Sequence, residues 1–224
     1  MAERRRCIAI GLLSLALLAT GSQAEESDAA TAEARQLAPL GGSAKRNGTR
    51  LQLRAANGRV VWFDSKHPDG NHEAQVEDYR LSGVTPDGKF FVVHGLFYES
   101  ETTYWVSRAT GVKTEVYDEP AVSLDGHHAV TALAREAFGP EGVFVWEIVG
   151  DRLVQRAHLT HADYGMFTFK RWTGNDTAEL ELFSHSFLAF CPGATSTTAT
   201  VRLTHGSQGW TVRKPAGAKD VRCE

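Results

Sequence analysis

The sequence has little cysteine, no long apolar run and no excess of positive charge. Only three of its 224 residues are cysteine, and the formal net charge is −3. The longest apolar stretch runs from Cys7 to Leu18, well short of the ~20 residues that a membrane-spanning helix needs. A mildly acidic chain gives no reason to expect nucleic acid or an anionic membrane as a partner. The sequence also lacks a G-x-S-x-G elbow, a glycine-rich phosphate loop and a His-Glu-x-x-His motif.

The N-terminus has the pattern of a secretory leader. Three arginines at positions 4–6 precede the short apolar run, and the small residues Ser22 and Ala24 follow it. This order predicts a signal peptide over residues 1–24 and a periplasmic or secreted protein. The alternative, an uncleaved N-terminal anchor, is disfavoured by the small residues at the expected cleavage site. Loss of the three arginines and of Glu3 would take the net charge from −3 to −5.

Two cysteines remain after the expected cleavage, Cys191 and Cys223. In an oxidising compartment a lone pair predicts one disulfide. This disulfide would tie the C-terminus to the body of the protein and contribute ~3 kcal/mol in the chain-entropy model. A redox function would favour a close C-x-x-C pair, which the sequence lacks.

The exported part divides into a lead-in and a single domain. Residues 25–48 are rich in alanine, glutamate, serine and glycine, and they are expected to be a flexible lead-in. Ala29 to Leu37 could form a short helix, but it lacks a wide apolar face. Residues 49–224 are expected to fold as one β domain, because this length suffices for one substantial core.

From Thr49 onward, short apolar runs alternate with turn residues, which indicates an all-β class. Asn57-Gly58 between two β-rich runs is a strong hairpin signal. Leu180 and its neighbours alternate with glutamates, as in a half-buried strand. The expected hairpins pair residues 51–53 with 60–63, 103–106 with 112–117, 143–146 with 152–157, and 198–203 with 210–213.

Two stretches repeat at a period near 40 residues. The turn over residues 84–88 (VTPDG) is followed by a similar turn over residues 122–126 (VSLDG), and Trp105 and Trp146 are similarly spaced. A unit of this length with four strands is the size of a propeller blade. The turn over residues 85–89 and the run from Tyr104 to Gly111 resemble the secreted β-propeller repeats of the TolB-like or WD40-like type.

The resemblance covers residues 78–159, two units, and the second unit has Leu124 where the pattern has proline. A third unit over residues 164–213 requires an insertion around residues 187–197. The resemblance therefore implies antiparallel four-stranded units in a small or incomplete β-propeller. The alternative is a β-sandwich whose turns happen to recur.

Candidate metal ligands come from two polar loops. His158, His161 and Asp163 follow an expected strand and offer two nitrogens and an oxygen to a divalent ion. A second loop contains His67, Asp69, His72 and Glu73. Both loops can equally be solvated turns, since neither matches a known ligand spacing. No cofactor is predicted, and the catalytic residues stay unknown.

Two functions of different class follow. The first is an exported, non-catalytic β-repeat module that binds a protein or an envelope component, in line with the periplasmic protein contacts implied by the TolB-like resemblance. The alternative is a metal-binding protein or metal-dependent hydrolase that uses a histidine loop. For either function we expect no nucleic-acid partner and no membrane-spanning segment in the mature chain.

Overall fold

The all-β class is confirmed. The computed structural model describes residues 20–67, 76–133, 140–160, 166–183, 197–213 and 221–223. Within these residues, strands make up most of the chain, preceded by the helix α1 (Thr20–Leu37) and the 3-10 turn η1 (Ala38–Leu40). None of the described helical residues forms a segment long and apolar enough to cross a membrane.

The strands form four antiparallel sheets that follow one another along the chain. The first sheet contains β1 (Ala44–Asn47), β2 (Arg50–Arg54) and β3 (Val60–Asp64). The second contains β4 (Glu77–Val84), β5 (Phe90–Phe97), β6 (Ser100–Ser107) and β7 (Lys113–Glu115). The third contains β8 (Ala121–Val122), β9 (His128–Leu133), β10 (Gly142–Val149) and β11 (Arg152–Leu159). The fourth contains β12 (Met166–Gly174), β13 (Thr177–Phe183), β14 (Thr197–Gly206), β15 (Gly209–Arg213) and β16 (Val221–Cys223), which pairs with β14.

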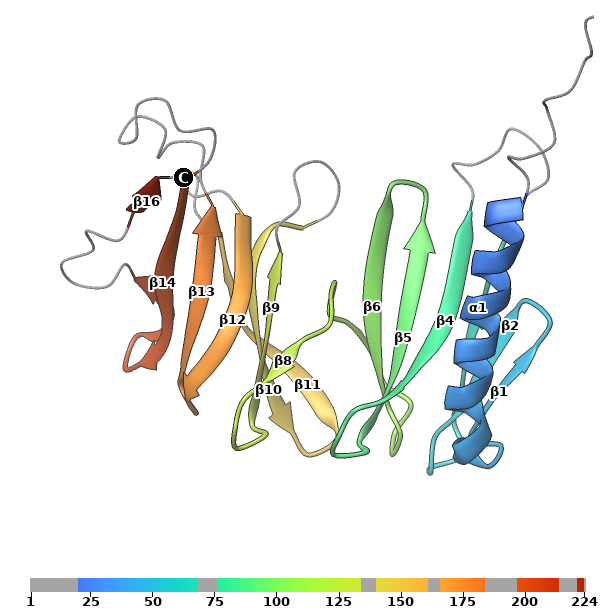
Figure 1. Cartoon of the computed structure of the whole chain (residues 1–224). Coiled ribbons are helices and arrows are strands. Elements are labelled where there is room, and N and C mark those ends of the chain that lie inside the picture. Colours follow the sequence, from blue (N-terminus) through green and yellow to red (C-terminus); the bar gives the residue numbers. More distant parts are fainter. Residues whose placement is uncertain are drawn as a thin grey trace, which may run out of the picture.

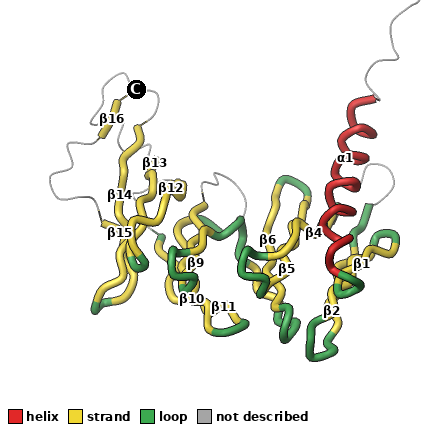
Figure 2. Tube along the Cα trace, turned by 60° about the horizontal axis from the view of Figure 1, so that its bottom comes forward, coloured by secondary structure: helices red, strands yellow, loops and turns green. Residues whose placement is uncertain are grey.

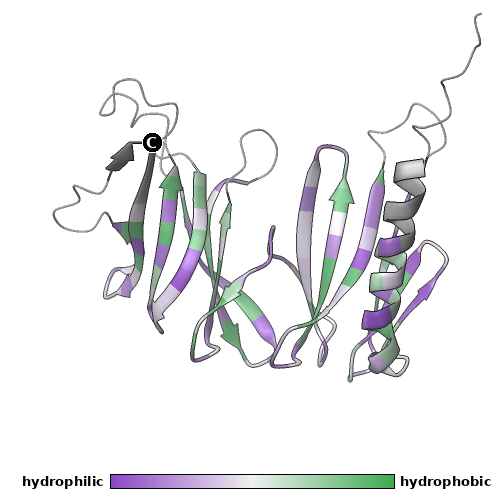
Figure 3. Ribbon diagram, in the orientation of Figure 1, coloured by the Kyte–Doolittle hydropathy of each residue, from purple (hydrophilic) through white to green (hydrophobic). Residues whose placement is uncertain are grey.

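The four hairpins expected from the sequence are present. β2 pairs with β3, β6 with β7, β10 with β11, and β14 with β15, all antiparallel. The half-buried strand around Leu180 is β13, in which Ala178, Leu180 and Leu182 are fully buried. Figure 3 shows the alternation of apolar and polar residues along the strands. Alternation gives β13, in an end sheet, one apolar face, whereas β5 and β10 of the inner sheets carry continuous apolar runs that are buried on both faces.

The sheets stack face to face in an open row (Figures 1 and 2). Three apolar clusters fill the spaces between successive sheets. Leu51 and Leu53 of the first sheet meet Phe91 and Val93 of the second, and Leu180 of the fourth sheet belongs to the cluster shared with the third. In both views the first and the last sheet lie at opposite ends of the row.

The outer faces of the two end sheets are polar, which explains why the row stays open. On the fourth sheet, Arg171, Glu179, Arg202 and Arg213 are paired in register across four strands. On the first sheet, Arg50 pairs with Asp64 beside the exposed Trp62. Closure of the row into a ring would bury these charges, whereas polar outer faces are what the ends of a repeat stack need in water.

The repeated turn seen in the sequence is a repeated hydrogen-bond pattern. Asp87 Oδ1 accepts bonds from Thr85 Oγ1 (2.6 Å) and Lys89 N (3.1 Å). Asp125 Oδ1 accepts the same pair from Ser123 Oγ (2.7 Å) and His127 N (3.1 Å). In each turn the hydroxyl also accepts the amide that opens the next strand. The second turn has the same bonds with Leu124, which is 75% exposed, in the place of the proline of the first.

The tryptophan spacing, by contrast, does not mark equivalent positions. Trp105 pairs with Val92 in the second sheet, whereas Val145 pairs with Val130, the counterpart of Val92, in the third. Trp146 is therefore one residue out of step with Trp105. Both rings nevertheless lie in the cluster between the second and third sheets, which they enter from opposite sides.

The aspartate turns predict a pH effect on stability. Hydrogen bonds from Ser123 Oγ and the amide of His127 hold the pKa of Asp125 below its usual value, because they favour the charged form. We expect Asp125→Ala to lower the free energy of unfolding by about 1 kcal/mol at pH 7. A depressed folded-state pKa gives stability that is present above the unfolded-state value and lost as the pH falls through the folded-state value. The difference between wild type and variant, measured by urea unfolding, should therefore shrink below about pH 4.

Asp125→Asn is the matched control for this prediction. Asn57 holds the corresponding turn of the first sheet with the same acceptor atom, Oδ1, which accepts from Arg59 N at 3.0 Å. The amide variant should therefore keep the turn and lose only the pH dependence. A constant difference between wild type and Asp125→Ala from pH 7 to pH 3 would show that the charge of Asp125 contributes nothing.

Residues 25–48, expected to be a flexible lead-in, contain regular secondary structure. The structure has most of α1, all of η1 and the strand β1 within these residues. The helix has no wide apolar face and is attached through Glu33, which is only 8% exposed. Helix α1 begins at Thr20, so removal of residues 1–24 would shorten the helix at its start and keep Glu33.

Candidate functional site

A cleft lies where the turns of three sheets meet. We call it the turn-end cleft; its volume is about 670 Å³. The turns that form it leave the strands along one edge of the row, the lower edge in Figure 1. The segment after η1, the end of β2 and the turns after β4, β6 and β10 line it, with the residues Gly41, Gly42, Ser43, Arg54, Ala55, Ala56, Gly88, Lys89, Arg108, Ala109 and Asp151.

Backbone hydrogen bonds hold the walls of the cleft together. Ala56 N donates to Arg108 O (2.8 Å) and Asn57 N donates to Ala109 O (3.1 Å), so the first and second sheets are joined at this point. The Arg108 guanidinium donates to Gly88 O at 2.8 Å and lies 5.3 Å from the centre of the Phe91 ring. The cleft is therefore preformed by main-chain contacts.

The side chains that line the cleft carry three positive charges and one negative charge. Lys89 Nζ lies 3.4 Å from Asp87 Oδ2, which belongs to the repeat turn. Burial alone would raise the pKa of Asp87, but hydrogen bonds from Thr85 and Lys89 outweigh burial and lower it, so Asp87 is charged at neutral pH. Among the described residues, the Arg54 guanidinium has no ion-pair or hydrogen-bond partner, and its side chain is exposed.

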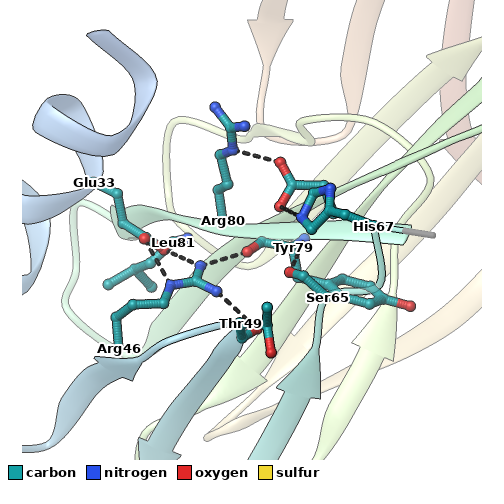
Figure 4. A network of polar contacts seen from close by, with 9 residues as sticks. Glu33, Arg46, Thr49, Ser65, His67, Tyr79, Arg80 and Leu81 are labelled. Atoms are coloured by element: carbon teal, nitrogen blue, oxygen red, sulfur yellow. Dashed lines mark hydrogen bonds and ion pairs between the residues drawn. The ribbon is translucent and has the colours of Figure 1, made fainter. Parts of the chain in front are cut away.

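A second polar site lies where helix α1 crosses β4 (Figure 4). The Glu33 carboxylate accepts from Arg46 Nη2 (2.6 Å), from Arg46 Nε (2.9 Å) and from Leu81 N (2.8 Å). Arg46 also donates to the carbonyl oxygens of Tyr79 and Thr49. β4 is the edge strand of the second sheet, so these contacts cap outward-facing backbone groups that have no neighbouring strand.

This network is a structural clamp. The Glu33 carboxylate accepts three hydrogen bonds, and the Arg46 guanidinium donates to three residues. These bonds leave little hydrogen-bonding capacity for a ligand. Ser65 Oγ accepts from Tyr79 N at 3.0 Å and caps one more group of the β4 edge. Cavities of about 360 and 290 Å³ lie beside Glu33, where the helix covers the sheets incompletely. We interpret this clamp as a structural feature that holds α1 on the first and second sheets.

A third group of polar side chains joins the third and fourth sheets. His128 Nδ1 lies 3.8 Å and His205 Nδ1 lies 3.6 Å from Asp176 Oδ1. The His205 ring stacks on Trp210 with centroids 4.9 Å apart, and the edge of Trp210 meets His128. His128 Nδ1 is buried without a hydrogen-bond partner. We interpret both histidines as packing residues between the third and fourth sheets, because both rings contact Trp210.

The predicted metal loop is described only at His158. This residue lies on β11, where its Nε2 atom is 2.8 Å from Glu141 O and its ring stacks on Phe144 at 4.0 Å. His161 and Asp163 lie outside the described residues, so the three-ligand site stays a prediction. Across the described part of the chain, no three His, Cys, Asp or Glu side chains are arranged to hold a metal ion.

The other predicted sites are described in part. In the second histidine loop only His67 is described, with its Nε2 atom 3.7 Å from Asp78 Oδ1, while Asp69, His72 and Glu73 lie outside the described residues. Cys191 also lies outside them. The backbone of Cys223 pairs with that of Thr197, which connects the C-terminal strand to β14. The disulfide between Cys191 and Cys223 stays a prediction.

Most of the described tryptophan side chains pack inside the protein. Trp105, Trp146 and Trp210 are buried, whereas Trp62 is 47% exposed beneath Arg50. Burial raises the pKa of Tyr104 to about 12, with Glu115 nearby adding to the effect. Tyr104 is therefore neutral at physiological pH and serves as a packing residue.

The turn-end cleft was not predicted from the sequence. Its lining comes from five separate segments, and the sequence predicted several of these turns individually but not their meeting in one site. The cation-bearing positions have no common spacing that would reveal them without the sheet stacking. A comparison with known proteins found neither a matching family model nor a matching curated protein.

Proposed function

We propose that this chain is an exported, non-catalytic binding module, built as an open propeller-type stack, that binds a protein or another envelope component through the turn-end cleft. The cleft carries the proposal. It is preformed, it brings together turns of three sheets, and it exposes Arg54, which has no ion-pair or hydrogen-bond partner among the described residues. Its volume falls in the range of about 300–1,000 Å³ that ligand sites occupy.

Three further features support this proposal. The leader pattern over residues 1–24 supports export to the periplasm or beyond. The repeated aspartate turns and the face-to-face sheets support the relation to propeller-type repeats, with polar end faces in place of ring closure. The preformed walls favour binding, because a rigid site loses little conformational entropy when it is occupied.

Site-specific cross-linking tests the proposal. A photoreactive residue at Ala109, in the cleft, is compared with one at Thr211, on the outer face of the fourth sheet. The full chain is produced with its own leader in a bacterial host, and the periplasm is fractionated. We expect a discrete adduct from position 109 only, which Arg54→Glu abolishes.

Two results would contradict the proposal. Equal adducts from both positions, or an adduct that survives Arg54→Glu, would show that the cleft is not the binding surface. Retention of the unprocessed chain in the cytoplasm would contradict export. Unchanged thermal unfolding of the variants is the control for an intact fold, since positions 54, 109 and 211 lie outside the three apolar clusters.

A further inference from the structure

We propose that the ligand of the turn-end cleft is an extended acidic segment of a partner protein. This inference rests on the proposed function and names the chemistry of the ligand. The cleft brings Arg54, Lys89 and Arg108 together in a chain whose net charge is −3. A local excess of positive charge on an acidic protein steers acidic partners toward that surface and disfavours basic ones.

The three cations differ in how much of their charge is available. Lys89 shares its charge with Asp87, and Arg108 uses one donor on Gly88 O. Because a guanidinium has five N–H donors, Arg108 keeps most of its hydrogen-bonding capacity while its position is fixed. Within the described part of the chain, no group occupies the donors of the Arg54 guanidinium. Two arginines of this kind suit carboxylates, which they bind through paired, charge-assisted hydrogen bonds.

The shape of the cleft suits a polypeptide backbone. Gly41 and Gly42 line one side, and a Cβ atom built on either of them would meet nothing within 4 Å. The main chain there is uncovered, so another chain can approach it closely. Gly42 has a φ of 87°, which side-chain-bearing residues rarely adopt, so this uncovered main chain depends on glycine.

Asp151 distinguishes a peptide from other anionic ligands. Its carboxylate lines the same cleft as the three cations. An occupant that carries only acceptors, such as a phosphate-rich surface, would be repelled by Asp151 and could not donate to it. A peptide offers N–H donors next to its acidic side chains, and it can therefore satisfy Asp151 and the arginines together.

The test is direct binding of a defined probe to the full exported chain. The probe is a fluorescein-labelled eight-residue peptide of alternating glutamate and serine, and its counterpart has lysine in place of glutamate. Fluorescence anisotropy is measured at low and at physiological salt. We expect the acidic peptide to bind, the lysine peptide not to bind, and the affinity to fall as salt increases.

Two variants that each replace one arginine by glutamate show whether binding occurs at the cleft. Arg54→Glu should weaken acidic peptide binding at least about tenfold, equivalent to about 1.4 kcal/mol. Arg213→Glu, an exposed arginine at the far end of the row, should change it by less than about twofold, because long-range charges are screened. Arg54→Lys should keep part of the affinity, since it retains the charge and loses the paired donors.

Each other outcome overturns the inference in a recognisable way. Binding to phosphatidylglycerol vesicles without peptide binding would assign the cleft to a membrane surface. Equal effects of the two charge reversals would show binding to net charge alone, and no binding at low salt would exclude acidic segments. A discrete cross-link from Ala109 with no peptide binding would overturn this inference and leave the proposed function standing.

Discussion

Replacing Glu33 by alanine is expected to release helix α1 from the sheets and to lower the free energy of unfolding by about 3 kcal/mol. The carboxylate is only 9% exposed, and among the described residues it is the only ion-pair partner of Arg46. Its loss leaves the amide of Leu81 without its acceptor and leaves the Arg46 guanidinium with only the carbonyl oxygens of Tyr79 and Thr49. Urea unfolding measures the change, and hydrogen exchange at the Leu81 amide should become faster.

Two substitutions control for this effect. Glu33→Gln keeps one acceptor oxygen and should lose less stability than Glu33→Ala. Arg35→Ala alters an exposed side chain on the same helix and should change stability by less than about 0.5 kcal/mol. Equal effects of Glu33→Ala and Arg35→Ala would show that helix propensity, and not the clamp, determines how α1 is held.

The second large effect is expected at Gly142, the first residue of β10. Its φ of 102° lies in the region that glycine favours. A Cβ atom there would come closer than 3.0 Å to the carbonyl oxygen of Leu159, which is backbone and cannot move aside without disturbing β11. We expect Gly142→Ala to lower the free energy of unfolding by about 3 kcal/mol, measured by urea unfolding.

Gly150→Ala is the matched control for this prediction. Gly150 also has a positive φ, 60°, but a Cβ atom built there meets nothing within 4 Å. This variant experiences the backbone strain without the contact, so we expect a loss of about 1 kcal/mol. Similar losses for the two variants would show that the contact with Leu159 is relieved at little cost.

Local patterns in the sequence predicted the local structure well. Turn chemistry and alternation identified the hairpins, since both signals arise from residues that are neighbours in the chain. The aspartate turn was identified for the same reason, and its hydrogen bonds join residues two to five positions apart. The order of strands within each sheet then follows from successive hairpins.

Features that depend on contacts between sheets were harder to predict. Helix α1 is held by Glu33, whose partner Arg46 and whose contact at Leu81 lie on two different sheets. A single buried carboxylate leaves no periodic apolar signal in the sequence. The openness of the row likewise depends on which face of each end sheet is charged. The turn-end cleft combines five segments, so it emerges only when the sheets are stacked.

The open row has a mechanical consequence. Each sheet packs on the sheets before and after it through the apolar clusters and a few hydrogen bonds, and among the described residues no hydrogen bond or ion pair joins the first sheet to the fourth. A force that pulls the N- and C-terminal sheets apart would therefore act on three interfaces in series, and the weakest would yield first. In a closed ring the same load would be shared by two paths. The force needed to extend this protein is thus set by its weakest interface between sheets. The addition or loss of an end sheet would leave the remaining interfaces as they are.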